Sequence, residues 1–529
     1  MQRILTFFSL LLILPTLGAQ PLHVNWQQCM GGTEGESGYG IIPLWNGYLL
    51  FCGSESGNGQ VPPIHGKGDF WLVRTDTLGA ILWSKTYGGS EIEHEKKILK
   101  CFDGGFALFG FTDSNDGNVS GNHGIADYWI IKVDSLGNLL WQRAFGGTSY
   151  DWSNTMAATP DSGFLLTGKS MSTDGNITGN HGFFDCWIVK LDRDGNLQWE
   201  KSLGGTGADV GICINTTSDG GYILGATTDL GNGDVVCNLH GSIDTWIVKL
   251  DATGNIEWQM CYGGSGGEGP NEIMQTSDGG YIFAGATDSN DGDVSGNHGE
   301  NDIWVVRIDS IGTLQWQRCF GGSRDDVARF IRQSSNGTFI VGGYTFSNDG
   351  DVTGNHSLPT TADAWVLRIS PTGDILWQQC IGGDENEAFA DMAEFPGGKI
   401  TFLGGSNTWD HSGDVQCEMH HNLFGDVWLV GLTDTTVVGN EELSEKPVMV
   451  SVYPNPAGDF INFRLNGLSS WHDSKITLYT MYGKVVHEFT LPAGQPEVSF
   501  SAADLPGGLY SFVLTNPAFT RTGKIILVR

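Results

Sequence analysis

Residues 302–322 read DIWVVRIDSIGTLQWQRCFGG, and the phrase in this stretch recurs along the chain. A complete copy has Asp-x-Trp, a second Trp twelve residues later, and Gly-Gly five residues after that. The second Trp recurs at intervals of 57 (Trp26 to Trp83) to 61 residues (Trp316 to Trp377). A period of this length predicts a repeat architecture. The first Trp lies at Trp71, Trp129, Trp187, Trp246, Trp304, Trp365 and Trp428, and the second at Trp26, Trp83, Trp141, Trp199, Trp258, Trp316 and Trp377.

Each repeat predicts four short antiparallel strands, called A to D. In one copy these are residues 271–276, 281–287, 303–309 and 314–320. The A–B turn carries Asp-Gly, a strong hairpin signal between alternating apolar residues. No helical period is visible, and four strands per repeat are typical of a β-propeller blade. A solenoid is the alternative.

The two ends of the repeat region favour a closed ring over a solenoid. Residues 23–29 form a D strand alone, and the last repeat ends after its C strand, with Asn440 where a second Trp is due. Pairing these ends would remove two exposed sheet edges. We therefore predict an all-β, seven-bladed propeller over residues 20–434, closed by the N-terminal strand. The A–B and C–D turns are then on one face, and function is expected on the other, which bears the longer B–C and D–A loops.

Composition limits the partners and the compartment. The 28 Lys and Arg face 60 Asp and Glu, and a net charge of −32 disfavours nucleic acid. Residues 1–19 have the basic start, apolar run and small cleavage residue of a secretory signal peptide, and no segment is long enough to span a membrane.

Ten cysteines in an exported chain permit disulfides. We nevertheless expect small core residues at one repeat position, because equivalent positions in different repeats face the same way. This position lies three residues after the second Trp and is occupied by Cys29, Cys261, Cys319 and Cys380.

Two acids recur in every repeat. One follows Gly-Gly by four residues and leads into strand A, where it either accepts local hydrogen bonds or forms a cation-attracting ring at the channel mouth. It is a candidate binding ring: Glu36, Glu93, Asp151, Asp209, Glu268, Asp326 and Glu387. The other stands two residues before the strand-C Trp and is interpreted as structural: Asp69, Asp127, Asp185, Asp244, Asp302, Asp363 and Asp426.

The long B–C loop offers oxygen ligands, as in residues 113–124, 288–299 and 347–356. Calcium prefers such ligands, although turn chemistry alone explains the same composition. The candidate calcium ligands are Asp113, Asn115, Asp116, Asp288, Asn290, Asp291, Asp293, Asp349 and Asp351. One His closes each loop and is expected to bond within it: His65, His123, His181, His240, His298, His356, and His420 or His421.

Two loops depart from this pattern, ending in residues 237–240 and 417–421, each of which begins with Cys. We find no catalytic set: no nucleophile elbow, Cys–His pair, phosphate loop or clustered metal ligands. The sequence therefore favours a non-catalytic module that binds glycan or protein, or serves as a scaffold. The alternative is a carbohydrate-active hydrolase using carboxylates on the long-loop face.

The tail has a different composition. Residues 435–447 form a predicted linker, after which three motifs follow in order: Val452–Asp459, Tyr482–Val486 and Leu505–Phe512. Residues 448–529 resemble the type A sorting domain of the type IX secretion system of Bacteroidota. The resemblance implies a small β-sandwich that engages this secretion machinery and directs passage from the periplasm across the outer membrane, leaving the protein secreted or attached to the outer surface. The Trp repeats are similar to those of large secreted proteins of the same bacteria.

Overall fold

The computed structural model describes residues 21–436 apart from 45, 357–359, 396, 409–410 and 421–424. In the tail it describes 449–453, 460–466, 474–480, 485–491, 497–503, 505–515 and 520–527. The predicted signal peptide and most of the predicted linker lie outside these residues. The chain divides into two compact units, Met1–Val438 and Gly439–Arg529.

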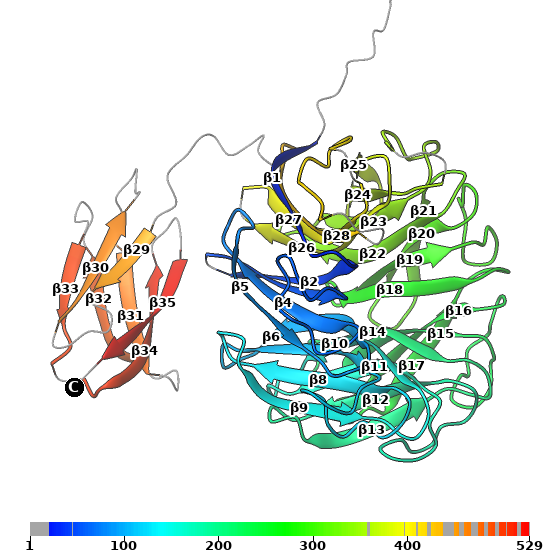
Figure 1. Cartoon of the computed structure of the whole chain (residues 1–529), viewed down its shortest axis with the longest axis horizontal. Helices are drawn as coiled ribbons and strands as arrows, with labels where there is room; N and C mark the ends of the chain where they lie inside the picture. Colours follow the sequence, from blue (N-terminus) through cyan, green and yellow to red (C-terminus); the bar gives the residue numbers. More distant parts are fainter. Residues whose placement is uncertain are drawn as a thin grey trace, which may run out of the picture. The chain divides into compact units, whose positions relative to one another are not determined.

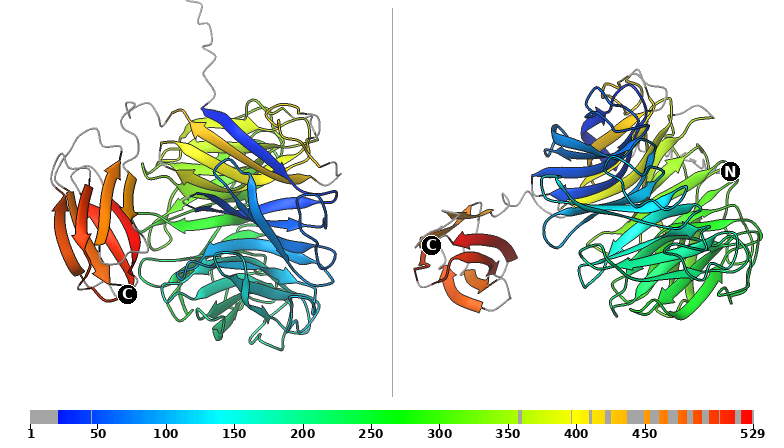
Figure 2. Two further views of the ribbon diagram at one scale, coloured as in Figure 1. Left: turned by 60° about the vertical axis from the view of Figure 1, so that its left-hand side comes forward. Right: turned by 60° about the horizontal axis from the view of Figure 1, so that its bottom comes forward.

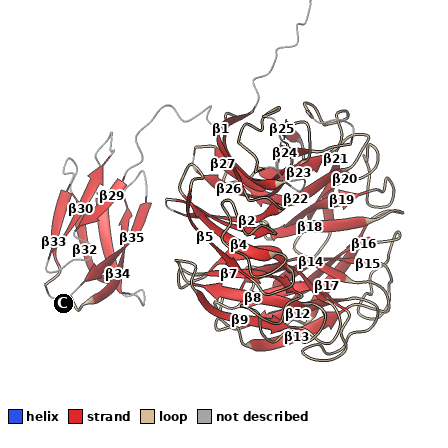
Figure 3. Ribbon diagram, viewed as in Figure 1, coloured by secondary structure: helices blue, strands red, loops and turns tan. Residues whose placement is uncertain are grey.

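All described regular structure is β-strand (Figure 3), which confirms the predicted repeated four-stranded antiparallel sheets. We number the sheets of the first unit 1 to 7 in chain order. Sheet 1 contains β2 (Glu36–Leu44), β3 (Gly47–Ser54), β4 (Asp69–Thr75) and β5 (Ile81–Tyr87); sheet 2 contains β6 (Glu93–Lys100), β7 (Phe106–Thr112), β8 (Asp127–Val133) and β9 (Leu139–Phe145); sheet 3 contains β10 (Asp151–Ala158), β11 (Phe164–Ser170), β12 (Asp185–Leu191) and β13 (Leu197–Leu203).

The remaining sheets follow the same order. Sheet 4 contains β14 (Val210–Thr216), β15 (Tyr222–Thr228), β16 (Asp244–Leu250) and β17 (Ile256–Tyr262); sheet 5 contains β18 (Glu268–Gln275), β19 (Tyr281–Thr287), β20 (Asp302–Ile308) and β21 (Leu314–Phe320); sheet 6 contains β22 (Asp326–Gln333), β23 (Phe339–Thr345), β24 (Asp363–Ile369) and β25 (Ile375–Ile381); sheet 7 contains β26 (Glu387–Phe395), β27 (Lys399–Ser406), β28 (Asp426–Asp434) and β1 (Leu22–Met30).

The sheets have a propeller-like arrangement, with successive sheets side by side (Figures 1 and 2). The first strand of each sheet contacts the first strand of the next, and β26 contacts β2. The N-terminal strand β1 pairs antiparallel with β28, from Leu22 opposite Asp434 to Met30 opposite Val427. Segments from the two ends of the repeat region therefore share sheet 7.

The hydrophobic core lies between neighbouring sheets, where the recurring tryptophans pack. Each strand-C Trp is at most 1% exposed. In six of the described sheets its Nε1–H donates to a Gln or Glu that follows the second Trp, as Trp129 does to Gln142 at 2.9 Å. A buried indole N–H needs such a partner. The second Trp covers the C–D turn of the next sheet: a Cβ on Gly137 would lie 2.9 Å from the ring of Trp83.

The Gly-Gly pair is required because neighbouring side chains approach its backbone too closely for a Cβ atom. A Cβ on Gly88 would lie 2.2 Å from Glu93 Oε2 and 2.6 Å from Asp69 Oδ1. A Cβ on Gly89 would lie 2.5 Å from the side chain of Ser114. The repeated phrase thus places an acid of one sheet, and an acid and the long loop of the next, around the side-chain-free segment that connects the two sheets.

The second unit contains two sheets. One has the order β29 (Met449–Tyr453), β30 (Phe460–Asn466) and β33 (Glu497–Ser501); the other has β32 (Val485–Leu491), β31 (Ser474–Thr480), β34 (Gly508–Thr515) and β35 (Thr520–Leu527). Their shared core includes Phe463 and Phe512, whose rings meet edge to face at 5.1 Å. No helix that could span a membrane is found among the described residues of either unit.

Candidate functional site

The seven acids of the candidate binding ring are buried at the start of each first strand, at most 2% exposed. Each accepts a hydrogen bond of 2.7–3.0 Å from the N–H of the second Gly of its Gly-Gly pair, as Glu93 does from Gly89. Six of them also accept a Ser or Thr hydroxyl from the second strand. In these six acids both carboxylate oxygens are thus engaged by neighbouring groups of the protein.

Burial also changes the ionisation of these acids. Desolvation raises the pKa of Glu93 to about 7 and those of Asp209 and Asp326 to about 6. It also raises the pKa values of Glu36, Asp151, Glu268 and Glu387. Since a low dielectric disfavours the charged carboxylate, these groups hold their protons to higher pH than exposed acids.

The seven acids interpreted as structural are bonded to the loop histidines. In each sheet, one carboxylate oxygen accepts both the backbone N–H and a ring-nitrogen contact of the His that closes the loop, with Nδ1···Oδ2 distances of 2.6–3.3 Å. In sheet 7 this His is His420; His421 lies outside the described residues. The Asp residues are at most 1% exposed. This bond fastens the end of the long loop to strand C.

The candidate calcium ligands bond mainly to backbone. Asp116, Asp291 and Asp349 each accept the N–H of the residue after Gly-Gly, at 2.6–2.8 Å. Asn115 and Asn290 close their loops, each accepting the N–H of a Gly six residues on. Two further candidates accept backbone hydrogen bonds: Asp288 from Gly267 N–H and Asp293 from Gly263 N–H. The last two lie near histidines, with Asp113 Oδ2 3.8 Å from His94 Nε2 and Asp351 Oδ2 4.0 Å from His298 Nε2. In the described part of the chain, no three His, Cys, Asp or Glu residues converge to hold a metal ion.

The expectation for the cysteines is wrong at two positions. Cys29 is disulfide-bonded to Cys417, and Cys237 to Cys261. In both cases the partner of the strand-D cysteine is the cysteine of a departing long loop, not a cysteine at the equivalent position of another sheet. Cys319 and Cys380 are free and buried, as small core residues would be. The two aberrant loops are therefore explained by covalent attachment.

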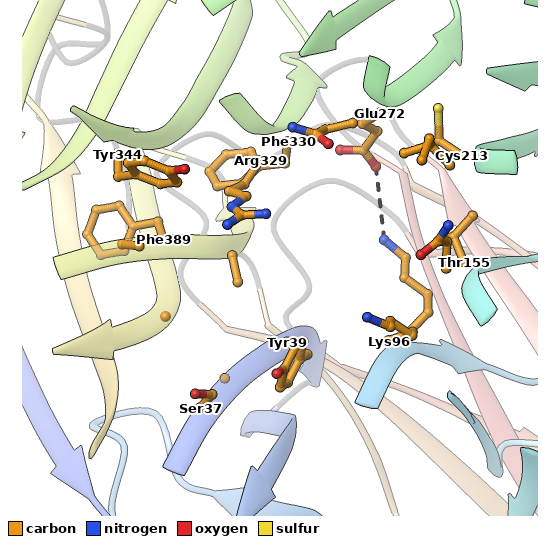
Figure 4. A pocket seen from close by; sticks show the side chains of 18 of the residues that line it. Ser37, Tyr39, Lys96, Thr155, Cys213, Glu272, Arg329, Phe330, Tyr344 and Phe389 are labelled. Carbon is orange, nitrogen blue, oxygen red and sulfur yellow. Dashed lines mark ion pairs between the residues drawn. The ribbon is translucent and has the colours of Figure 1, made fainter. Parts of the chain in front are cut away.

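The first unit contains a cavity of about 960 Å³, which Figure 4 shows from close by. It is lined by residues from the first strand of all seven sheets. Of the candidate binding ring, Glu387 is in its lining. In every sheet the residue three positions after the ring acid also lines it: Tyr39, Lys96, Asn154, Ile212, Asn271, Arg329 and Ala390.

This position carries six residue types in the seven sheets, and the positions beside it on the first strand vary as well. The sequence analysis missed these side chains because it searched for what recurs. A comparison of the first strands for positions that vary between repeats would have found them together with their neighbours on the strand.

An aromatic cluster adjoins the cavity on the long-loop side of sheets 2 and 3. The rings of Trp152 and Phe184 are 5.8 Å apart, and Phe183 contacts Phe184 at 4.5 Å. Lys169 Nζ lies over Trp152 and Phe184, at 4.7 and 4.5 Å from their centres. Residues at the Trp152 position in the other sheets are Ser37, His94, Val210, Gly269, Val327 and Ala388.

The aromatic cluster meets the cavity through two residues. Asn154 lines the cavity two residues beyond Trp152 on β10. Lys96, also in the lining, has Nζ 5.7 Å from the ring centre of Phe111, which is 6.4 Å from Trp152. Phe183 is 59% exposed, so the cluster offers an accessible aromatic surface. The cavity lining and the aromatic cluster are thus neighbouring asymmetric features of a largely repetitive unit.

Comparison with known proteins identifies the tail. Residues 451–528 match the family model "Secretion system C-terminal sorting domain". The chain therefore carries a C-terminal sorting domain, and this domain indicates export to the cell surface or beyond.

Two curated proteins match more than half of the chain at low identity. It is 22% identical over 373 residues to the Regulatory protein FlaEY of Caulobacter vibrioides, covering 63% of this chain and 38% of that protein. It is 20% identical over 369 residues to the Uncharacterized WD repeat-containing protein L264 of Acanthamoeba polyphaga mimivirus, covering 58% and 23%. The chain thus spans well under half of either relative.

The chain resembles solved structures only weakly, as their TM-scores show. A puromycin hydrolase matches with a TM-score of 0.41 and 12% identity, covering 83% of this chain and 58% of that one. The extracellular domain of the putative one-component system BT4673 from B. thetaiotaomicron matches with a TM-score of 0.22 and 10% identity, covering 93% and 81%. These similarities assign no activity.

Proposed function

We propose that residues 20–434 form a closed seven-bladed β-propeller, that residues 435–447 link it to a sorting domain at 448–529, and that residues 1–19 are a signal peptide. The seven sheets, the contact between β26 and β2, and the pairing of β1 with β28 support the ring. A ring leaves no open end that would need a cap.

We propose that the mature protein is an exported, non-catalytic binding module whose ligand is a glycan. The observation that carries this is the aromatic cluster, present at one place while the rest of the unit repeats. An aromatic face attracts the slightly positive C–H groups of a sugar ring. The adjoining cavity, at about 960 Å³, is at the upper end of the usual size for small-ligand sites.

The test is a glycan array followed by calorimetry with any glycan that binds. Replacing Trp152 with alanine is expected to weaken binding of that glycan about tenfold, which corresponds to the loss of an aromatic contact of about 1.4 kcal/mol. Phe183→Ala is a second variant, at an exposed position that the fold does not need. Phe102→Ala is the matched control, because Phe102 is 95% exposed in the A–B turn of sheet 2.

Two results would overturn this function. One is an array without any bound glycan. The other is unchanged affinity in both Trp152→Ala and Phe183→Ala. A parallel hydrolysis screen decides about the alternative, since turnover of any polysaccharide would make the protein a hydrolase.

We also propose that the long loops are held by their own hydrogen bonds, without calcium. The carboxylates of Asp116, Asp291 and Asp349 are already used by backbone N–H groups. Excess EDTA is therefore expected to leave the melting temperature unchanged. A calcium-dependent rise of several degrees, growing with calcium concentration as ligand binding requires, would refute this.

A further inference from the structure

The cavity contains more positive than negative charge, although the chain carries −32 overall. Lys96, Lys97, Arg329 and Arg332 all line it. Two of these cations are already paired. Arg332 bridges sheets 5 and 7 by ion pairs with Glu272 and Asp391, and Lys97 Nζ is 4.0 Å from Glu272. Figure 4 shows the contact between Glu272 and this lysine as a dashed line.

The other two cations of the cavity lining are Lys96 and Arg329. Neither forms an ion pair within 4 Å among the described residues; instead, each lies over an aromatic ring, Lys96 over Phe111 and Arg329 over Tyr344. They come from sheets 2 and 6, and both reach the same cavity (Figure 4). Arg329 is exposed and Lys96 is half-buried.

The two cations lie within each other's field. Burial lowers the pKa of Lys96, and the charges of Arg329 and Lys169 contribute in the same direction, against the effect of Glu95. Glu95 is itself buried, and desolvation raises its pKa well above the usual range, so it is a weak counter-charge. A bound anion would relieve the repulsion between the cations.

We propose that the glycan bound here is acidic and that its carboxylate or sulfate group is received by Lys96 and Arg329, while a neighbouring sugar ring stacks on Trp152. This inference rests on the proposed function and specifies its substrate class. Arg suits such a group because its planar fork matches carboxylate and sulfate oxygens.

The overall negative charge does not prevent this binding. At physiological ionic strength the Debye length is about 8 Å, so acids on the outer surface are largely screened from a group inside the cavity. A long polyanion lying over that surface would still be repelled, which favours a short segment or chain end that enters the cavity.

The test compares three probes by calorimetry: a trigalacturonide, a sulfated galactan oligosaccharide and a neutral galactan oligosaccharide of equal length. At least one acidic probe is expected to bind about tenfold more tightly than the neutral one. Comparing the two acidic probes distinguishes a carboxylate from a sulfate as the recognised group. Raising the salt concentration is expected to weaken the acidic probes alone.

The variants are Arg329→Gln and the double variant Lys96→Met, Arg329→Gln. Both are expected to bring the acidic probes down to the affinity of the neutral one, with the neutral probe unchanged. Arg193→Gln is the matched control, because Arg193 is 75% exposed in a C–D turn. Arg329→Gln serves alone if the double variant does not fold, since Arg329 is exposed.

The outcomes separate the two proposals. Equal binding of neutral and acidic probes, or an acidic preference retained in Arg329→Gln and the double variant, would overturn the acidic-ligand inference and leave the glycan function standing. Absence of binding by all probes and all glycans on the array would overturn both. Weaker binding of every probe in Trp152→Ala, by about tenfold, is expected under either proposal.

Discussion

Replacing Cys29 and Cys417 with alanine is expected to destabilise the protein more than replacing Cys237 and Cys261. The disulfide joins residues 388 apart, whereas Cys237 and Cys261 are 24 apart. In the chain-entropy account, constraining the unfolded chain contributes about 6 kcal/mol for the long closure and about 3.5 kcal/mol for the short one. The expected difference, about 2.5 kcal/mol, is large beside typical protein stabilities.

The position of this bond adds a second reason. Cys29 is on β1, the edge strand of sheet 7, and the long loop bearing Cys417 connects β27 to β28. Without the disulfide, the antiparallel pairing with β28 would be the main attachment of β1 to its sheet. Faster hydrogen exchange in β1 is therefore expected in the variant than in the native protein.

The measurement is urea unfolding of three proteins: native, Cys29→Ala/Cys417→Ala and Cys237→Ala/Cys261→Ala. The second double variant is the matched control, since it removes the same chemistry from an equivalent position. Equal losses of free energy in the two variants would contradict the argument from closure length. Unchanged exchange in β1 would contradict the argument from attachment.

The Trp phrase was sufficient to predict repeated four-stranded sheets, because its spacing has a direct geometric cause. A strand-C Trp buried between sheets and a strand-D Trp over the next C–D turn require the same separation in every copy. Gly-Gly is likewise required by the carboxylates beside it. Residues that recur because of packing therefore predict the architecture, but they do not predict the binding site.

The cysteine prediction failed for a related reason. It compared equivalent positions only, and these do face the same way. The disulfide partners are cysteines of the long loops. The sequence contained a sign of this pairing, because Cys237 and Cys417 occur in the two sheets that also have Cys261 or Cys29 in strand D. Sheets 5 and 6 have Gly296 and Gly354 in the corresponding part of the loop, and their Cys319 and Cys380 are free.

The candidate site is the part of the protein that the sequence alone predicts least well. The cavity residues are far apart in sequence, and Lys96 and Arg329 acquire a shared environment only when sheets 2 and 6 surround one cavity. The acids recognised from the sequence are mostly internal, engaged with Gly-Gly and with hydroxyl groups. Recurrence indicated where the fold is held together, and the departures from recurrence indicated the candidate binding surface.

The buried acids also predict an unusual pH dependence of stability. The folded-state pKa of Glu93 is about 7 against an ordinary 4.5, and that of Asp127 is about 6 against 3.8, in both cases mainly through burial. The native state therefore binds more protons than the unfolded state between about pH 4 and pH 7. By linkage, stability falls as the pH rises through this range.

Other groups add to this trend or set its lower limit. The hydrogen bond to Asp363 raises the pKa of His356, so its contribution is present below pH 6.5 and lost above the raised pKa. The pKa values of Asp161 and Asp219 are lowered instead, to about 2. Burial alone would raise them, but hydrogen bonds from neighbouring groups, including Lys190 and Lys249, outweigh burial. Their contribution is lost as the pH falls from about 4 to 2.

The melting temperature of the exported protein is accordingly expected to be highest near pH 4–5 and to fall toward pH 8. Glu93→Gln should flatten this profile, because an amide cannot ionise. The rise of the Glu93 pKa from 4.5 to about 7 corresponds to roughly 3 kcal/mol of stability between low and high pH. Glu257→Gln is a matched control at a half-exposed position on β17, and it should leave the slope between pH 5 and 8 unchanged. Thermal unfolding from pH 3 to 9 provides the measurement. A maximum at pH 7–8, or a slope unaffected by Glu93→Gln, would show that the buried acids are ionised in the native state at little cost.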